Sequence, residues 1–294
     1  MAKLEKVAIG IDLGERSLRI ARWTAERLAP GAELLLVYVV EPPPLSIFYR
    51  GVLPPREKMV EAAMEPAKVK LAELAAELGD SRAKTDLRVG RPAECIAAAA
   101  QDANADLIVI GRHGRHHSWG ELGSTAEELF HFATTPVLLP DDLPTDVGVI
   151  LMPIEDGKLA PRVIEWARFL SEKYGSKIIA LHVLSQMLRG HLRLISTTKT
   201  TERAEASARE AAEAWVAEAL AAAGLDMSQT VIEIAVGHTD QEILEAKERN
   251  NADFIVMGSH GPGELERAVM GSCASTVTRH ARCPVLVVLA GEER

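Results

Sequence analysis

Three glycines and a serine near the carboxyl-terminal end of the chain have the spacing of an anion-binding loop. Gly258 and Gly261 follow the apolar run FIVM, and Gly271 and Ser272 open the next segment of helical pattern. A glycine lets backbone approach a ligand closely because it has no Cβ, and a helix amino terminus offers unpaired N–H groups and a positive dipole end. The pattern predicts a loop that holds a diphosphate or triphosphate, with Ser272 donating its hydroxyl to phosphate or capping the helix.

The chain repeats itself. Residues 89–114 and 236–261 align without a gap and share Val-Gly, Asn-Ala-Asp, Ile-Val and Gly-x-His-Gly. A duplication explains this match better than chance. We therefore expect two domains, residues 1–144 and 145–294, joined near the proline- and aspartate-rich residues 140–146.

The first copy repeats the glycine pattern with a shorter loop. Only residues 115–122 separate its second and third glycines, where the second copy has residues 262–270. The missing residue is expected to disturb the phosphate site, although arginine and histidine in the short loop could supply compensating positive charge. The residues of the pattern in this copy are Gly111, Gly114, Gly123 and Ser124.

Both halves read as alternating apolar strands and helices, which imply parallel sheets covered on both faces. Right-handed crossovers then give an α/β fold of two Rossmann-like, doubly wound domains with five parallel strands each. Ligands bind such sheets at the carboxyl ends of the strands, where the glycines lie. The expected strands are 6–11, 33–40, 85–89, 107–111, 136–140, 149–154, 177–184, 230–236, 254–258 and 284–289. The expected helices are 17–29, 59–79, 92–104, 125–133, 160–175, 201–224, 240–250 and 272–281.

Two common nucleotide-binding motifs are missing: the sequence has no GxxxxGK[ST], and no GxGxxG follows the first strand of either copy. The spacing G-x2-G-x9-G-[ST] in the second copy instead resembles the ATP-binding motif of the universal stress proteins. With the duplication, the whole chain resembles a tandem universal stress protein. The resemblance implies a regulatory protein of the stress response that binds an adenine nucleotide (ATP, or else AMP or ADP), with Mg²⁺ held partly by the phosphates.

The resemblance also implies the residues of both sites. In ATP-binding members, an aspartate at the end of the first strand contacts the ribose; Asp12 matches it, whereas the second copy has Glu155. A valine after the second strand, whose backbone meets adenine, corresponds to Val39 and Val183. The nucleotide-binding residues expected in the second copy are Pro153, Glu155, Val183, Met257, Gly258, His260, Gly261, Gly271 and Ser272. Those expected in the first copy are Asp12, Val39, Gly111, His113, Gly114, Gly123 and Ser124.

Each copy thus departs from the pattern once, by loop length in the first and by the acidic residue in the second. The second copy is the favoured site, because phosphate binding depends on loop length more strictly than ribose contact depends on aspartate rather than glutamate. Structural alternatives stay open for the same residues. The glycines could simply turn the chain, and Asp12 or Glu155 could cap the following helix. Trp23 and Trp166 are expected in the core.

Other reactive residues have alternatives as well. His113, His116 and His117 lie close enough in sequence to ligate a metal, but surface histidines near an anion site are the favoured interpretation. Cys273 could have a lowered pKa at a helix amino terminus or could be an ordinary small side chain facing the core. The proline-rich residues 41–56 could form a flap over the nucleotide, or they could contact a hydrophobic partner or a lipid.

Catalysis is not the leading expectation. Phosphoryl transfer needs charge stabilisation and a positioned base or nucleophile, and the second loop offers only His260 and Arg267 as helpers. Weak ATP hydrolysis is the most that we expect. The alternative function is an interaction scaffold, or a hydrophobic-ligand binder, that has lost nucleotide binding in one or both halves.

Composition limits the partners and the location. The net charge of −9 argues against nucleic-acid binding, and three widely spaced cysteines suit a reducing cytoplasm. No signal peptide or membrane span is expected. The closing strands, TPVLLP and CPVLVVL, resemble the dimer-forming edge of the family, which implies an internal pseudo-dimer of the two halves and leaves room for a homodimer. We also expect a protein partner, which the sequence does not identify.

Overall fold

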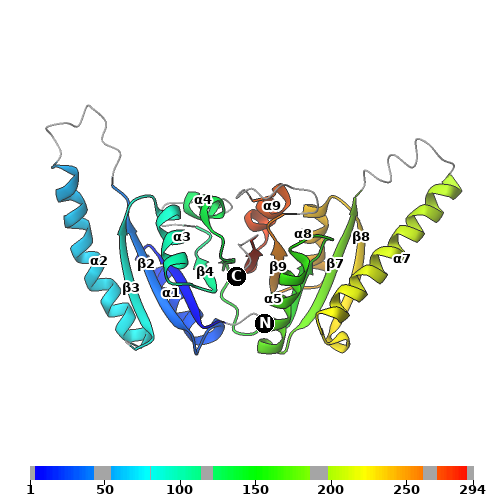
Figure 1. Ribbon diagram of the computed structural model, residues 1–294, viewed down its shortest axis with the longest axis horizontal. Coiled ribbons are helices and arrows are strands. Elements are labelled where there is room, and N and C mark those ends of the chain that lie inside the picture. Colours follow the sequence, from blue (N-terminus) through cyan, green and yellow to red (C-terminus); the bar gives the residue numbers. More distant parts are fainter. Residues whose placement is uncertain are drawn as a thin grey trace. The chain divides into compact units, whose positions relative to one another are not determined.

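The computed structural model describes residues 4–42, 54–79, 81–113, 122–185, 198–260 and 270–289. Contacts divide the chain into two units, one of Lys3–Leu143 and the other of Pro144–Ala290. Each unit is described by itself. Figure 1 shows the same alternation of strands and helices in both.

The N-terminal unit is a parallel sheet with the strand order β3-β2-β1-β4-β5. The chain moves outward from β1 to β3 and then crosses back to β4, so the order reverses between β1 and β4. Its strands are β1 (Lys6–Ile11), β2 (Glu33–Val40), β3 (Ala83–Val89), β4 (Leu107–Ile110) and β5 (Val137–Leu139). Its helices are α1 (Glu15–Trp23), the π-helical continuation η1 (Thr24–Leu28), α2 (Arg56–Leu78), α3 (Pro92–Asp102) and α4 (Ser124–Phe132).

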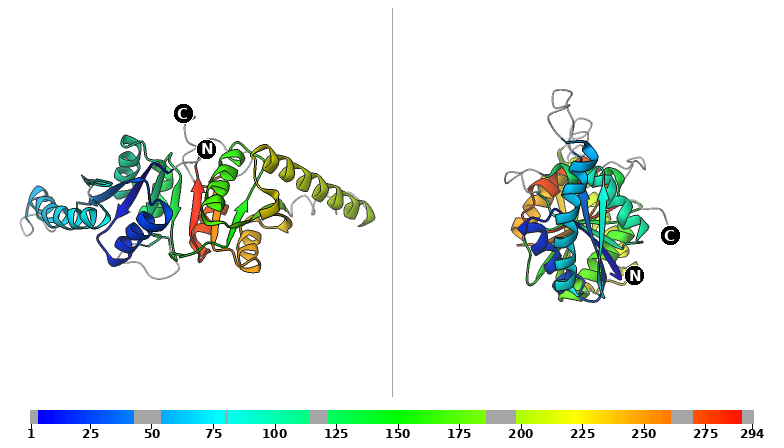
Figure 2. Two further views of the ribbon diagram at one scale, coloured as in Figure 1. Left: turned by 90° about the horizontal axis from the view of Figure 1, so that it is seen from below. Right: turned by 90° about the vertical axis from the view of Figure 1, so that its left-hand side faces the viewer.

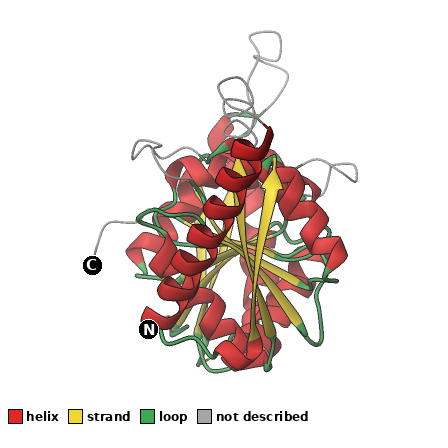
Figure 3. Ribbon diagram, turned by 90° about the vertical axis from the view of Figure 1, so that its right-hand side faces the viewer, coloured by secondary structure: helices red, strands yellow, loops and turns green. Residues whose placement is uncertain are grey.

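The C-terminal unit repeats this arrangement with the order β8-β7-β6-β9-β10, again parallel throughout. Its strands are β6 (Val149–Pro153), β7 (Lys177–Ser185), β8 (Thr230–Gly237), β9 (Phe254–Gly258) and β10 (Val285–Val288). Its helices are α5 (Ala160–Tyr174), α7 (Thr198–Ala222), the 3₁₀ turn η3 (Met227–Gln229), α8 (Thr239–Arg249) and α9 (Ser272–His280). Figure 3 views this unit from the side of α7, with the strands in yellow.

Apolar composition explains why helices cover both faces of each sheet. Nearly every residue of β1, β4, β6 and β9 is buried, so the central strands need cover on both sides. Right-handed crossovers place α1 and α2 on one face of the N-terminal sheet and α3 and α4 on the other, as Figure 2 shows. In sheets of this kind, ligands bind in a crevice at the carboxyl ends of the strands, where the strand order reverses.

The predicted fold is confirmed: each half is a doubly wound α/β domain with a parallel sheet. Trp23 and Trp166 are buried on the first helix of each unit, at 7% and 6% exposure, as expected for core residues. The predicted helix that begins at Met59 starts earlier, at Arg56. Within the described ranges, no helix is long and apolar enough to cross a membrane.

The repeated Asn-Ala-Asp sequence has a structural role in both units. Asn104 and Asn251 come shortly after α3 and α8, with φ angles of 52° and 47°. This left-handed region is open to asparagine more readily than to most side chains, so the residue helps the chain turn into the next strand. The alanines that follow, Ala105 and Ala252, are buried.

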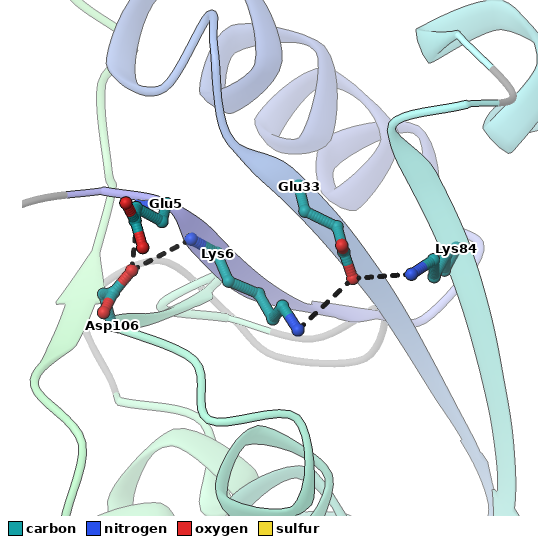
Figure 4. A network of polar contacts seen from close by, with 5 residues as sticks. All are labelled: Glu5, Lys6, Glu33, Lys84 and Asp106. Carbon is teal, nitrogen blue, oxygen red and sulfur yellow. Dashed lines mark hydrogen bonds and ion pairs between the residues drawn. The ribbon is translucent and has the colours of Figure 1, made fainter.

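The aspartate of the same sequence joins two strands at the amino-terminal edge of the sheet. Asp106 Oδ2 accepts hydrogen bonds from the N–H groups of Glu5 (2.8 Å) and Lys6 (2.9 Å), as Figure 4 shows. Asp253 Oδ2 makes the same pair of bonds at the start of β6, at 2.8 and 3.0 Å. The repeated motif therefore stabilises the sheet at the edge opposite to the glycines.

Ion pairs tie three strands together beside Asp106. Glu33 Oε1 lies 3.4 Å from Lys6 Nζ and 3.0 Å from Lys84 Nζ (Figure 4). The hydrogen bond from Lys84, with the nearby Lys6, lowers the pKa of the Glu33 carboxyl. Because the folded pKa is depressed, this contribution to stability is present above the unfolded pKa and is lost as the pH falls toward the folded value.

Replacing Asp106 with alanine is expected to lower the unfolding free energy of the N-terminal unit by about 2 kcal/mol, because two backbone N–H groups lose a charged acceptor. Native-state hydrogen exchange of β4 peptides measures this loss, with β9 peptides as the internal reference. Asp106→Asn keeps one acceptor oxygen and should cost less than half as much. Equal protection of β4 in Asp106→Ala and in the unaltered chain would contradict the assigned role.

Candidate functional site

A glycine stands at the carboxyl end of β4 and of β9, beside the point where the strand order reverses. A Cβ on Gly111 would lie 3.2 Å from Ile20 Cδ1, and a Cβ on Gly258 would lie 3.3 Å from Leu159 Cδ1. Both distances are shorter than ordinary van der Waals contact between carbon atoms. A side chain at either position would therefore crowd the unit's first helical segment, which would have to shift by a few tenths of an ångström.

The loops that follow these glycines have the same hydrogen bond between their ends. The N–H of Gly123 donates to the carbonyl of Arg112 at 2.8 Å, and the N–H of Gly271 donates to the carbonyl of Ser259 at 2.8 Å. The same hydrogen bond, called the glycine anchor below, thus joins the two ends of the shorter loop in the first copy and of the longer loop in the second. Two predicted glycines lie outside the described residues: Gly114 and Gly261.

Helices α4 and α9 begin alike at these anchors. Gly123 and Gly271 are the N-cap residues, with φ and ψ of −64° and 144° in one and −60° and 152° in the other, and neither helix has a side-chain cap. The alternative in which Ser272 caps its helix is wrong, because Gly271 takes the cap position and Ser272 is the first helical residue. Uncapped first-turn N–H groups are donors that an anion can use.

Asp12 organises the turn between β1 and α1. Its Oδ1 accepts hydrogen bonds from the Gly14 N–H at 2.8 Å and from Ser17 Oγ at 2.6 Å. Leu13, which lies between Asp12 and Gly14, has a φ angle of 61°. This left-handed conformation costs a residue with a side chain roughly 1–2 kcal/mol. The alternative in which Asp12 caps the helix is wrong, because Gly14 is the N-cap of α1 and no side chain caps this helix. The Asp12 carboxylate instead holds the strained turn before α1, and it also lines the cavity described next.

The N-terminal unit has a cavity of about 420 Å³ at this edge. Its lining combines the end of β1, the end of β2, the start of α3 and the start of α4. The structure therefore brings together residues that are far apart in the sequence. The predicted residues of the first copy that line it are Asp12, Val39, Gly111, His113, Gly123 and Ser124.

Sequence reasoning missed several residues of this cavity. Arg16 lies in the first turn of α1, and Tyr38 lies one residue before Val39. Both lie close in sequence to predicted site residues, Arg16 to Asp12 and Tyr38 to Val39. This closeness is the signal that could have identified them. In the C-terminal unit His182 takes the place of Tyr38 in the strand register, and its Nδ1 lies 2.9 Å from the Ile154 carbonyl.

Pro153 makes the C-terminal site different from the N-terminal one. β1 pairs with β4 over four residues that end at Gly10, whereas β6 pairs with β9 only at Ile150 and Leu151. A proline has no N–H to donate, so the ladder between the central strands ends earlier. Gly10, the matching residue in the N-terminal unit, lines the cavity.

The other residues predicted for the second copy lie at the same sheet edge. Val183 is buried within β7, and Val39 likewise lies within β2, so neither follows its strand as expected. Met257 is buried in β9. His260 Nδ1 lies 2.9 Å from Ser259 Oγ.

Within the described part of the chain, no group of three or more histidine, cysteine or acidic side chains could hold a metal ion. His113 belongs to that part, whereas His116 and His117 lie outside it. Partial burial raises the pKa of the Cys95 thiol, which disfavours its nucleophilic form. Cys273 is half-buried on α9.

Each unit is therefore a doubly wound α/β domain that gathers glycines, an acidic residue and an uncapped helix amino terminus where the strand order reverses. This arrangement is typical of nucleotide-binding folds. A sequence profile described as the Universal stress protein family matches the chain twice, at residues 3–139 and 147–288. The chain belongs to the universal stress protein family and carries two of its domains in tandem.

Relatives of full length support this assignment. A universal stress protein from Mycolicibacterium smegmatis is 27% identical over 299 residues, covering 96% of each chain. Universal stress protein Slr1230 from Synechocystis is 24% identical and covers 94% of this chain and 96% of its own. The crystal structure of a universal stress protein from Archaeoglobus fulgidus has the same fold, with a TM-score of 0.69, 23% identity and coverage of 98% and 97%.

Proposed function

We propose that this universal stress protein binds an adenine nucleotide at the carboxyl edge of each sheet and that occupancy regulates its interactions with protein partners under stress. The observation that carries the proposal is the cavity of the N-terminal unit. It brings Asp12, Val39 and both ends of the glycine loop to one place. ATP is the proposed ligand, with AMP and ADP as the related alternatives.

The cavity supports each part of such a ligand. Its volume of about 420 Å³ falls within the range of small-molecule sites, roughly 300–1,000 Å³. Ile96, Ile110 and Val39 give it apolar walls for a base, and Asp12 supplies a carboxylate for ribose hydroxyls. The first turn of α4 supplies backbone N–H groups for phosphate. Mg²⁺ would be held chiefly by the phosphates.

The C-terminal unit is proposed as a second site because it repeats the critical backbone features. The hydrogen bond between the loop ends and the N-cap conformation match those of the N-terminal unit. Pro153 and His182 stand where the first unit has Gly10 and Tyr38, so the two sites should differ in affinity. Binding rather than turnover is the proposed activity, with ATP hydrolysis below about one per second, near the low end of enzyme rates.

Photo-crosslinking of the full chain with 8-azido-ATP, followed by mapping of the labelled peptides, tests this proposal for each half separately. We expect label in peptides of both units, and we expect excess unlabelled ATP to remove it with midpoints in the micromolar range. Phosphate release under the same conditions measures hydrolysis. If neither unit is labelled in a competable way, nucleotide binding is refuted and the scaffold alternative takes its place.

Three further expectations stay predictions: the pairing of the two halves as an internal pseudo-dimer, a homodimer of the whole chain, and a cytoplasmic location. Size-exclusion chromatography with light scattering measures the second of them directly, and it should be repeated with and without ATP.

A further inference from the structure

Two arginines share one carboxylate beside the cavity of the N-terminal unit. Arg16 Nη2 donates to Asp141 Oδ1 at 2.5 Å and lies 3.3 Å from the Asp141 carbonyl oxygen. Asp141 Oδ2 lies 3.7 Å from Arg112 Nη1. Arg112 is 2% exposed, Asp141 14% and Arg16 30%, so this charge cluster of Arg16, Asp141 and Arg112 is buried at Arg112 and partly open to water at Arg16.

The charge cluster lies on the side of the cavity that belongs to the glycine loop. Arg16 itself lines the cavity. Arg112 directly follows Gly111, and its carbonyl accepts the N–H of Gly123 at the start of α4. Asp141 contacts both arginines, so it fixes the Arg16 side chain near that end of the cavity.

Two guanidinium groups face the Asp141 carboxylate in this cluster. A guanidinium retains its charge at all ordinary pH values and matches the geometry of phosphate oxygens. Two other carboxylates line the cavity, Asp12 and Glu41. The Asp12 carboxylate already accepts hydrogen bonds from Gly14 and Ser17 in the turn before α1. A phosphate at the glycine end would therefore meet Arg16 as well as the N–H groups of α4.

The C-terminal unit has uncharged residues at two of these positions. With Trp23 and Trp166 aligned, Leu159 stands at the position of Arg16. Ser259 corresponds to Arg112, because its carbonyl accepts the matching hydrogen bond from Gly271. In this unit Arg162 Nη1 donates to the Leu289 carbonyl at 2.6 Å. The C-terminal unit therefore lacks the ion pair between Arg16 and Asp141 but keeps a guanidinium against the segment that follows its last strand.

We propose that Arg16 is the phosphate-contacting residue that determines specificity in the N-terminal site, and that Asp141 positions it. The inference rests on the proposed nucleotide function and narrows it. The N-terminal site should discriminate strongly between phosphorylated and unphosphorylated adenosine, and the C-terminal site should do so less.

The test uses the full chain and 8-azido-ATP labelling, resolved to each unit by peptide mapping. Competition by ATP, adenosine and inorganic triphosphate gives an apparent affinity for each probe at each site. Arg16→Leu copies the residue of the C-terminal unit, and Arg16→Lys keeps a charge without the planar fork. Arg19→Leu removes the same charge from an exposed position on the same helix and serves as the control.

We expect Arg16→Leu to weaken ATP and triphosphate at the N-terminal site at least tenfold and to leave adenosine within twofold. Arg16→Lys should lose less, Asp141→Asn should lose about threefold to fivefold for ATP, and Arg19→Leu should change nothing. Labelling of the C-terminal unit should be unchanged in all variants.

The outcomes separate this inference from the proposed function. If the N-terminal unit binds ATP and Arg16→Leu leaves its affinity unchanged, or weakens adenosine equally, the role of Arg16 is refuted and nucleotide binding stands. A second outcome is that triphosphate protects Arg16 from a general arginine reagent while 8-azido-ATP labels neither unit. In that case the anion site is supported and the nucleotide function is refuted. If neither ATP nor triphosphate interacts with the N-terminal unit, both are wrong.

Discussion

Replacing Gly123 with valine is expected to weaken ATP binding by the N-terminal unit by at least about 100-fold, or about 2.8 kcal/mol. Gly123 lines the cavity and precedes the uncapped first turn of α4. A branched side chain there would occupy the space next to the N–H groups proposed to hold phosphate. Its backbone angles of −64° and 144° are open to valine, so the loss should come from binding and not from a strained fold.

The matched substitution in the other half is Gly271→Val, whose N-cap conformation is almost the same. Each variant should remove label from its own unit and spare the other, which 8-azido-ATP labelling with peptide mapping reports directly. Gly31→Val is the control, because a Cβ on Gly31 would meet nothing within 4 Å. Undiminished labelling of the N-terminal unit in Gly123→Val, with the fold intact by circular dichroism, would exclude the start of α4 as the phosphate site.

Replacing Asp141 with asparagine should lower the unfolding free energy of the N-terminal unit by about 3 kcal/mol, the lower end of the cost of breaking a buried ion pair. The change removes the negative charge that lies 3.7 Å from the buried Arg112 guanidinium, and it removes the charged bond from Arg16. Native-state hydrogen exchange of β4 peptides measures the loss, and β9 peptides report on the unaffected unit. The readout is needed for each unit because two domains need not unfold together.

Two companion variants test the electrostatic cause. Asp142→Asn changes the adjacent, exposed aspartate and should cost less than about 0.5 kcal/mol. Adding Arg112→Met to Asp141→Asn removes the buried charge at similar volume and should recover at least half of the lost stability. A loss in Asp141→Asn no larger than that in Asp142→Asn would show that the charge cluster does not stabilise the unit.

The two units keep the same backbone frame with different side chains at the site. The aspartate bridge at the amino-terminal edge and the glycine anchor at the carboxyl edge recur in both. At two matched positions the side chains differ: Arg16 and Tyr38 of the N-terminal unit correspond to Leu159 and His182 of the C-terminal unit. The two units thus share the contacts that hold the edges of the sheet, while they differ at these two positions near the carboxyl edge.

Local patterns in the sequence were sufficient for the fold and for the backbone of the site. Apolar runs predict the buried strands because a parallel sheet needs cover on both faces, and the glycine spacing marks the loop and the helix that follows. These features depend on residues that are neighbours along the chain, and the repeat shows them twice. The family assignment followed from the same short-range evidence.

Only the tertiary structure decided which distant residues meet. Arg16 and Asp141 are separated by 125 residues, and Asp106 is 100 residues away from Lys6, whose N–H it accepts. The shorter first loop predicts a disturbed phosphate site, which stays a prediction, whereas only the structure shows that the bond between Gly123 and Arg112 matches that of the longer loop. Such contacts follow from how strands are ordered in the sheet, and no spacing within one segment of sequence encodes them.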